Sequence, residues 1–182
     1  LPSWTQLIST PTKKIALLAN WEEKIEKMIS KVIHEDVRSI SGVPSWTILL
    51  LEKILAKTKS KTIKEIWPNL ELYMHGGISM SPYQNAFKKL IGKKINYLEI
   101  YNASEGFFAI QNDLQKKDLL LMLDYGIFYE FIPIENGKES SKITPLHKVK
   151  KNKNYAIVIS TNGGLWRYKI GDTIKFTSIK PS

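Results

Sequence analysis

LELYMHGGISMSPYQNAFKKLIGKKINYLEIYNASEG, residues 70–106, contains two short apolar runs with an amphipathic segment between them. The runs Leu70–His75 and Asn96–Tyr101 are partly β-branched or aromatic and are bounded by Gly and Asn, which is typical of strands. The segment between them predicts a helix that is capped by Ser81, carries Pro82 in its first turn and ends at Gly92. This order predicts a parallel strand pair with a right-handed crossover, so functional loops should follow the carboxyl ends of both strands.

Two helices are predicted before this unit. Apolar residues recur at helical spacing from Trp21 to Ile33, with charged side chains on the opposite face. A second helix is expected from Pro44 to about Lys57, because proline suits the first turn of a helix and a broad apolar stripe follows it. We expect these helices to cover the sheet.

The last third of the chain has the pattern of antiparallel β structure. Short apolar runs alternate with turn-forming stretches at residues 135–138, 151–154 and 162–164. The candidate strands are Leu119–Leu123, Ile127–Ile132, Tyr155–Thr161, Leu165–Tyr168 and Thr173–Thr177. The predicted fold class is therefore α/β, with a helix-covered, partly parallel sheet followed by antiparallel, β-barrel-like strands. We predict an α/β subdomain over residues 1–112 and a β-rich subdomain over residues 113–182.

Composition restricts the possible functions. The 182 residues are 43% hydrophobic, enough for a core, yet no run reaches the roughly 20 apolar residues of a membrane span. The absence of cysteine excludes disulfides and thiolate metal sites and fits a cytoplasmic location. The three histidines lack metal-ligand spacing. The start, Leu1-Pro2-Ser3-Trp4, has neither Met nor a signal peptide, so we expect a piece of a longer protein.

The chain is basic, with 27 basic and 17 acidic residues and a formal net charge of +10. Such a charge favours encounters with anions, including nucleotides and nucleic acid. The excess consists mostly of lysines in turns and on helix surfaces, which also fits an ordinary solvated surface. Because no nucleic-acid-binding motif is present, nucleic acid is not the expected partner.

One motif combines three chemical groups at the end of a predicted strand. Tyr101-Asn102-Ala103-Ser104-Glu105-Gly106 places an aromatic ring, a hydroxyl and a carboxylate in one loop. The ring can stack on a base, the hydroxyl can bond a phosphate oxygen, and the carboxylate can hold the Mg²⁺ that neutralises phosphates. An ordinary strand-end turn, with Tyr101 in the core and Glu105 in solvent, would contain the same residues.

Two further motifs also end predicted strands. The paired glycines of His75-Gly76-Gly77-Ile78-Ser79 permit close approach of a flat ligand, although a tight turn needs the same residues. The stretch from Gly164 to Asp172 ends in Gly-Asp, where the Asp172 carboxylate can accept both hydroxyls of a ribose, although Gly-Asp is also a common turn. The chain has no Gly-rich phosphate loop with a Lys-Ser or Lys-Thr signature.

In order and spacing, these three motifs resemble those of the adenylate-forming acyl-acid amido synthetases, the auxin-responsive family of plants and its bacterial relatives. The segments GVPSW (42–46), FYEFIP (128–133) and YAIVIST (155–161) are also similar to connecting segments of that family. The resemblance covers most of the chain, which is identified as a central fragment of a bacterial-type member.

The resemblance implies a ligase that uses ATP and Mg²⁺ to adenylate a carboxylic acid and then transfers the acyl group to an amino acid or another amine. In this family Tyr101 would stack on adenine and Asp172 would bind the ribose hydroxyls. Ser104 would bond the phosphate or the acyl carboxylate, and Glu105 would hold Mg²⁺; these two are the expected catalytic residues. Gly76, Gly77 and Ile78 would line the base pocket.

The sequence departs from the family pattern at two positions of the last motif. Lys169 stands where plant members usually carry Arg, and Trp166 stands where they usually carry Tyr. The fine geometry of this strand is therefore open, but neither change removes the carboxylate of Asp172.

The family's Ser/Thr-Gly-rich phosphate loop and its mobile C-terminal domain with a catalytic Lys would be missing N- and C-terminal segments of the same protein. Without their electrostatic contributions, we expect little or no adenylation by these 182 residues alone. Two alternatives stay open. One is a non-catalytic basic binding module for an acidic partner or nucleic acid, whose binding would be strongly salt-dependent. The other is a degenerate ligase that binds nucleotide without turnover.

Overall fold

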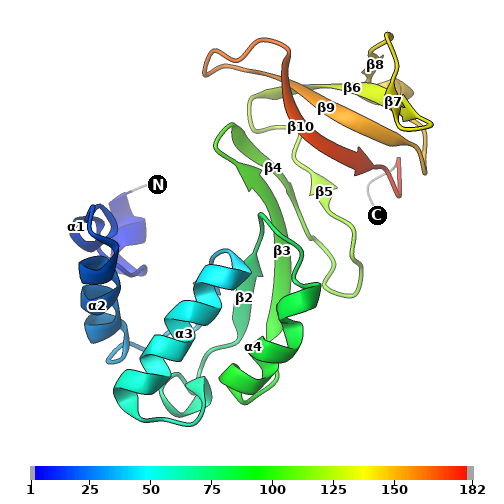
Figure 1. Ribbon diagram of the computed structural model, residues 1–182. Coiled ribbons are helices and arrows are strands. Elements are labelled where there is room, and N and C mark those ends of the chain that lie inside the picture. Colours follow the sequence, from blue (N-terminus) through cyan, green and yellow to red (C-terminus); the bar gives the residue numbers. More distant parts are fainter. Residues whose placement is uncertain (1–2, 180–182) are drawn as a thin grey trace. The chain divides into compact units, whose positions relative to one another are not determined.

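A computed structural model describes residues 3–179, and its contacts divide the chain into two compact units, Leu1–Ile100 and Tyr101–Ser182 (Figure 1). Leu1 and Pro2, on which part of the expectation about the chain start rests, lie outside the described residues. The predicted division into subdomains near residue 112 stays a prediction. The helices and 3₁₀ turns are η1 (Ser3–Leu7), α1 (Lys13–Ala16), α2 (Trp21–Val32), α3 (Pro44–Thr58), η2 (Ile63–Glu65), η3 (Ser81–Tyr83), α4 (Gln84–Ile91) and η4 (Leu146–Lys148). The strands are β1 (Ser39–Ser41), β2 (Leu72–His75), β3 (Asn96–Ala103), β4 (Gly106–Ile110), β5 (Leu120–Leu121), β6 (Ile127–Glu135), β7 (Lys138–Glu139), β8 (Thr144–Pro145), β9 (Asn154–Thr161) and β10 (Tyr168–Lys175).

The first unit is a helix-covered parallel sheet. Strand β2 pairs in parallel with β1 on one side and with β3 on the other. Helices α3 and α4 lie beside each other over these strands (Figure 1). The core between the layers includes the rings of Tyr73 and Phe87, which stack with their centroids 4.5 Å apart. Helix α2 adds Ile25 and Ile29 to the same core.

The second unit is built mainly from antiparallel strands. Its larger sheet has the order β10-β9-β6-β7, and β8 also pairs with β6. Strands β4 and β5 pair antiparallel and end the five-stranded order β1-β2-β3-β4-β5. Buried side chains, among them Phe108, Phe131 and Tyr155, form its core. The predicted fold class, a partly parallel α/β layer followed by antiparallel strands, is confirmed. None of the helices within residues 3–179 combines the length and apolarity needed to cross a membrane.

The predicted helices after Trp21 and from Pro44 are confirmed, but the start of α4 and the last strands differ from the prediction. Ser81 does not cap α4: it opens η3, and α4 follows from Gln84 without a side-chain cap. Of the strand predicted over Leu165–Tyr168 only Tyr168 is in a strand, and it begins the bulged strand β10, which also contains the start of the strand predicted from Thr173. Strands β1, β4, β7 and β8 were not predicted.

Gly92 ends α4 as predicted, with a left-handed φ of +76°. A Cβ atom at this position would lie 2.6 Å from Cβ of Thr62, and a left-handed backbone disfavours any residue with a Cβ. We therefore expect Gly92→Ala to lower the free energy of unfolding by about 2 kcal/mol, measured by urea denaturation. Gly163→Ala is the control, because its Cβ would meet only Oγ1 of Thr161, at 3.6 Å. Equal stability of the two variants would contradict the expectation.

Candidate active site

The second unit brings together two of the residues that the sequence singled out. The hydroxyl of Tyr101, on β3, donates a hydrogen bond to Oδ2 of Asp172, on β10, with an O···O distance of 2.6 Å. The two residues are 71 positions apart in the chain. Bonds from a hydroxyl to a carboxylate are short and strong because the acceptor is charged. The first residue of the YNASEG motif and the Asp of the Gly-Asp motif therefore share one site.

Tyr101 is half-buried and sits in an electronegative environment. Its ring packs against Phe108, with centroids 5.0 Å apart and the planes tilted by 55°. Burial first, then the hydrogen bond to Asp172, and then the charges of Asp172 and Glu105 raise the pKa of Tyr101 above its ordinary value. The phenol therefore stays protonated at neutral pH and donates its proton to the carboxylate.

Ser104 and Glu105 form the two-residue turn that joins β3 to β4. Ser104 is exposed and Glu105 is half-buried. Within residues 3–179, neither side chain is held by a hydrogen bond or an ion pair. The hydroxyl and the carboxylate of this turn are therefore available to a ligand next to Tyr101.

Gly76, Gly77 and Ile78 belong to the first unit, where they follow β2. Gly77 has a φ of +80°, and Ile78 is exposed. His75 precedes them and is only 4% exposed, and its Nδ1 atom has no hydrogen-bond partner among the described residues. Burial lowers the pKa of His75, so its imidazole is neutral at pH 7.

Asp172 lies in an irregular part of β10. In the pairing with β9, Lys169 lies opposite Val158 and Thr173 lies opposite Ala156, so four steps along β10 match two steps along β9. Gly171, within the bulge, has a φ of +102°, which a glycine adopts readily. The bulge turns Asp172 out of the regular ladder, and the sequence analysis did not predict it.

The residues just before this bulge are fixed by two ion pairs that the sequence did not reveal. Arg167 donates through Nε and Nη2 to the two carboxylate oxygens of Glu130, at 2.9 and 3.2 Å. The ammonium group of Lys169 lies 3.0 Å from a carboxylate oxygen of Glu139. Lys169, which replaces the Arg expected from the family pattern, therefore has its own partner in this chain.

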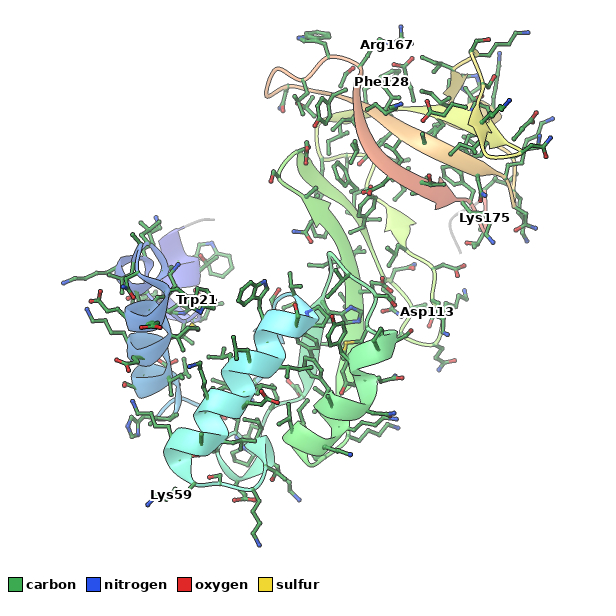
Figure 2. The ribbon with its side chains drawn as sticks, in the orientation of Figure 1. Trp21, Lys59, Asp113, Phe128, Arg167 and Lys175 are labelled. Atoms are coloured by element: carbon green, nitrogen blue, oxygen red, sulfur yellow. The ribbon has the colours of Figure 1, made fainter. Side chains whose placement is uncertain are left out.

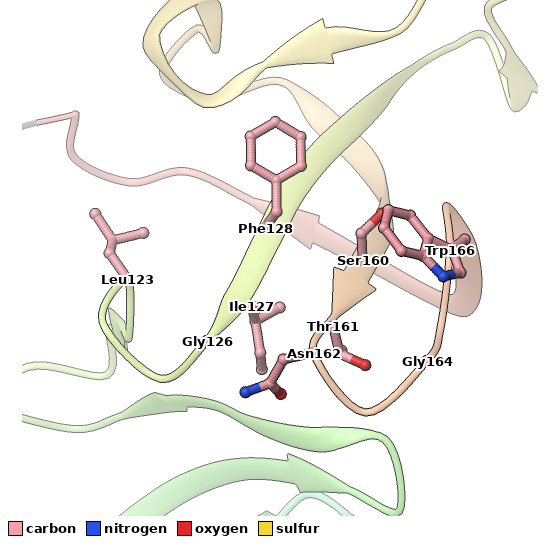
Figure 3. Close-up of a pocket in the computed structure, with 9 residues that line it drawn as sticks. All are labelled: Leu123, Gly126, Ile127, Phe128, Ser160, Thr161, Asn162, Gly164 and Trp166. Atoms are coloured by element: carbon pink, nitrogen blue, oxygen red, sulfur yellow. The ribbon is translucent and has the colours of Figure 1, made fainter.

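Two hollows lie within the second unit. One, of about 460 Å³, is bordered by Phe128 and Ile127 of β6 and by Ser160, Thr161 and Trp166 (Figure 3). The other, of about 570 Å³, has largely apolar walls and includes Tyr101. Tyr101 therefore has one side exposed to a space that is large enough for a small molecule.

Two family models match this chain. The model described as the GH3 family N-terminal domain matches residues 1–95, and the one described as the GH3 family central domain matches residues 120–182. The chain belongs to the GH3 family. The matched ranges contain the motifs at residues 75–79 and 164–172, and the motif at residues 101–106 lies between the two ranges.

Among GH3 proteins, an indole-3-acetic acid-amido synthetase of Arabidopsis thaliana, GH3.10, is 29% identical over 133 residues, which cover 64% of this chain and 22% of that protein. A probable indole-3-acetic acid-amido synthetase of Oryza sativa subsp. japonica, GH3.11, is 28% identical over 185 residues, and the match covers 93% of this chain. That match covers 28% of the rice protein. The chain thus spans about a quarter of the length of these GH3 relatives.

Solved structures show the same fold. The GH3.15 acyl acid amido synthetase superposes with a TM-score of 0.69 at 15% identity, over 88% of this chain and 38% of that protein. A 2-hydroxyisobutyryl-CoA ligase superposes with a TM-score of 0.52 at 12% identity, over 79% of this chain and 29% of that protein. The GH3 chain therefore has the architecture of part of an adenylate-forming enzyme.

Among the described residues, the candidate for the expected Mg²⁺ site is the carboxylate of Glu105. Residues 3–179 contain no group of three or more His, Asp or Glu side chains that could hold a metal ion. Mg²⁺ commonly keeps several waters and binds through one or two carboxylates together with substrate phosphates. The free, half-buried carboxylate of Glu105 fits this mode of binding.

Proposed function

We propose that the full-length protein is an ATP-dependent ligase that adenylates a carboxylic acid and transfers its acyl group to an amino acid or another amine. Membership of the GH3 family supports this proposal, because matched relatives are named as amido synthetases. The observation that carries it is the hydrogen bond between Tyr101 and Asp172. That bond unites the two motifs to which the family resemblance assigns adenine and ribose.

In this proposal Tyr101 and Asp172 bind the nucleoside together. The tyrosine hydroxyl uses Oδ2 of Asp172, so Oδ1 is the oxygen left for a ribose hydroxyl. The tyrosine ring, packed on Phe108, would offer its open side to adenine. For Gly76, Gly77 and Ile78 the assignment to the base pocket stays a prediction from the family resemblance.

Ser104 and Glu105 would act at the phosphates. The Ser104 hydroxyl would donate a hydrogen bond to a phosphate or to the substrate carboxylate, and the Glu105 carboxylate would hold Mg²⁺. When bound, this ion supplies positive charge that neutralises the phosphates as negative charge shifts onto the leaving pyrophosphate. A short two-residue turn suits this task because it holds both side chains on a rigid hairpin.

The reaction would proceed in two steps. An oxygen of the substrate carboxylate forms a bond to the α-phosphorus of ATP, and the bond from this phosphorus to the bridging oxygen breaks, so that pyrophosphate leaves. The nitrogen of the amine then bonds to the acyl carbon, the bond from this carbon to the AMP oxygen breaks, and the amine loses a proton. Tyr101, Ser104, Glu105 and Asp172 would hold the nucleotide in place for both steps.

Three related predictions belong to this proposal. The α/β subdomain to residue 112 would carry the adenine-site loops, and the β-rich subdomain from residue 113 would carry the ribose-binding Asp172. The protein would act in the cytoplasm on small molecules. It would be a bacterial-type member that needs its other segments for turnover.

The test is ATP-pyrophosphate exchange by the full-length protein across a panel of carboxylic acids. We expect exchange with one acid or a small set of related acids, which would also identify the substrate class. Absence of exchange with every acid, together with absence of ATP binding in calorimetry, would contradict the proposal. A salt-sensitive gel shift with DNA or RNA would then favour the basic binding module.

A further inference from the structure

We propose that Arg167 is a positioning residue for the nucleotide site, acting through a lock that it forms with Glu130 and Ser160. The inference rests on the proposed function, because it concerns how Asp172 is held for a ribose. Arg167 itself does not contact Tyr101 or Asp172 in the structure.

The backbone of Arg167 is in an uncommon conformation. Its φ is +48°, in the left-handed region that residues with a Cβ rarely adopt. Residues in such conformations persist where their surroundings hold them, and they occur often at functional sites. The surroundings of Arg167 should therefore contain contacts that fix it.

Two contacts do so, from two different strands. The backbone N–H of Arg167 donates to Oγ of Ser160 on β9, at 2.9 Å. The guanidinium group donates two hydrogen bonds to Glu130 on β6. Glu130 is partly buried, with 18% of its side chain exposed, whereas 60% of the Arg167 side chain is exposed. We call these three residues the Arg167 lock; Figure 2 shows Arg167 at the entry to β10 and Lys175 at its end.

The lock sits where it can set the register of β10. Only Tyr168 and Lys169 separate it from the bulge, and both pair with β9. A strand that slips by one residue turns every side chain to the opposite face. Because the bulge interrupts the ladder, the pairing before it is short, and the lock adds contacts to β6 and β9 beside the Lys169–Glu139 ion pair. In this register the Asp172 carboxylate accepts the hydrogen bond of Tyr101.

An ordinary surface ion pair is the competing interpretation, since exposed pairs contribute little to stability and need no function. The chain offers a matched control for this interpretation. Lys153 pairs with Glu135 at 2.9 Å. Glu135 is the last residue of β6, five residues after Glu130 of the lock. Removal of this pair should leave Asp172 in place.

The experiment compares the affinities of the full-length protein for ATP and for 2′,3′-dideoxy-ATP, which lacks both ribose hydroxyls. The affinity for ATP divided by the affinity for the dideoxy analogue measures how much the contact between Asp172 and the ribose hydroxyls contributes to binding. We expect Arg167→Ala, Arg167→Lys and Glu130→Gln each to reduce this ratio about tenfold, whereas Lys153→Ala keeps the wild-type ratio. Arg167→Lys is included because it keeps the charge and is the milder change if Arg167→Ala does not fold. The double variant Arg167→Ala with Asp172→Ala should have the ratio of Asp172→Ala alone.

Folded lock variants, judged by their melting temperatures, that keep the wild-type ratio would overturn the positioning role and leave the proposed function intact. A ratio that falls equally in Lys153→Ala would also overturn it. Wild-type protein that binds ATP and the dideoxy analogue equally, or neither, would instead contradict the ribose role of Asp172, and the inference would fall with it.

Discussion

Replacing Glu105 by glutamine in the full-length protein is expected to reduce ATP-pyrophosphate exchange by about 100-fold or more. Loss of one preorganised electrostatic contribution commonly costs an enzyme 100-fold to 1,000-fold in rate, and this change removes the only free carboxylate of the turn between β3 and β4. The glutamine keeps the size of the side chain, so the fold should be unaffected. Exchange should be measured at several Mg²⁺ concentrations, because a weakened ion site raises the concentration that is required.

Glu135→Gln is the matched control for this prediction. Glu135 is an exposed carboxylate of the same unit whose partner is Lys153, and it does not belong to the proposed site. Its variant should exchange pyrophosphate at the wild-type rate. Equal rates for the Glu105 and Glu135 variants at every Mg²⁺ concentration would remove Glu105 from the proposed mechanism.

Asp172→Ala is expected to weaken ATP binding by about 2 to 4 kcal/mol, which corresponds to a dissociation constant roughly 30-fold to 1,000-fold higher. The substitution removes charged hydrogen bonds to the ribose, and it also removes the acceptor of the half-buried Tyr101 hydroxyl. Titration calorimetry of the full-length protein measures the change directly.

Tyr101→Phe separates these two contributions, because it keeps the carboxylate and removes only the tyrosine hydroxyl. We expect this variant to lose less affinity than Asp172→Ala. Unchanged affinity of Asp172→Ala for ATP would refute the ribose-binding role.

Local patterns in the sequence were sufficient for the elements whose ends depend on one or two residues. Pro44 starts α3 and Gly92 ends α4, because proline fixes φ and glycine accepts a left-handed conformation wherever they occur. Ser81 shows the limit of this reasoning. Its side chain could have capped a helix, but the chain makes a 3₁₀ turn first and α4 starts later.

The β structure was less predictable, because pairing depends on residues far away in the chain. Strand β4 follows a Ser-Glu turn, which lacks the Asn-Gly or Asp-Gly pair that indicates a hairpin, so this strand was not predicted. Gly171-Asp172 was interpreted as the end of a strand, whereas it forms a bulge within β10. A bulge and a turn use the same residue types, and only the partner strand distinguishes them.

The candidate site, too, was predicted only in part from local sequence patterns. The motifs identified Tyr101, Glu105 and Asp172 as candidates, but the contact between Tyr101 and Asp172 is a tertiary contact that no spacing predicts. Arg167 was not identified at all, since an arginine gives no sign in the sequence that its backbone is left-handed. The only available signal was its place two residues before the Lys169 at which the family pattern changes.

Trp166, which borders the same hollow as Ser160 of the Arg167 lock, can report on this region by its fluorescence. The other tryptophans, Trp4, Trp21, Trp46 and Trp67, all belong to the first unit, so Trp166 is the single indole of the second. Its side chain is 82% exposed, and a collisional quencher such as acrylamide will reach it readily. A nucleotide-induced change in emission that disappears in Trp166→Phe would therefore originate near the entry to β10, and one that persists would originate in the first unit.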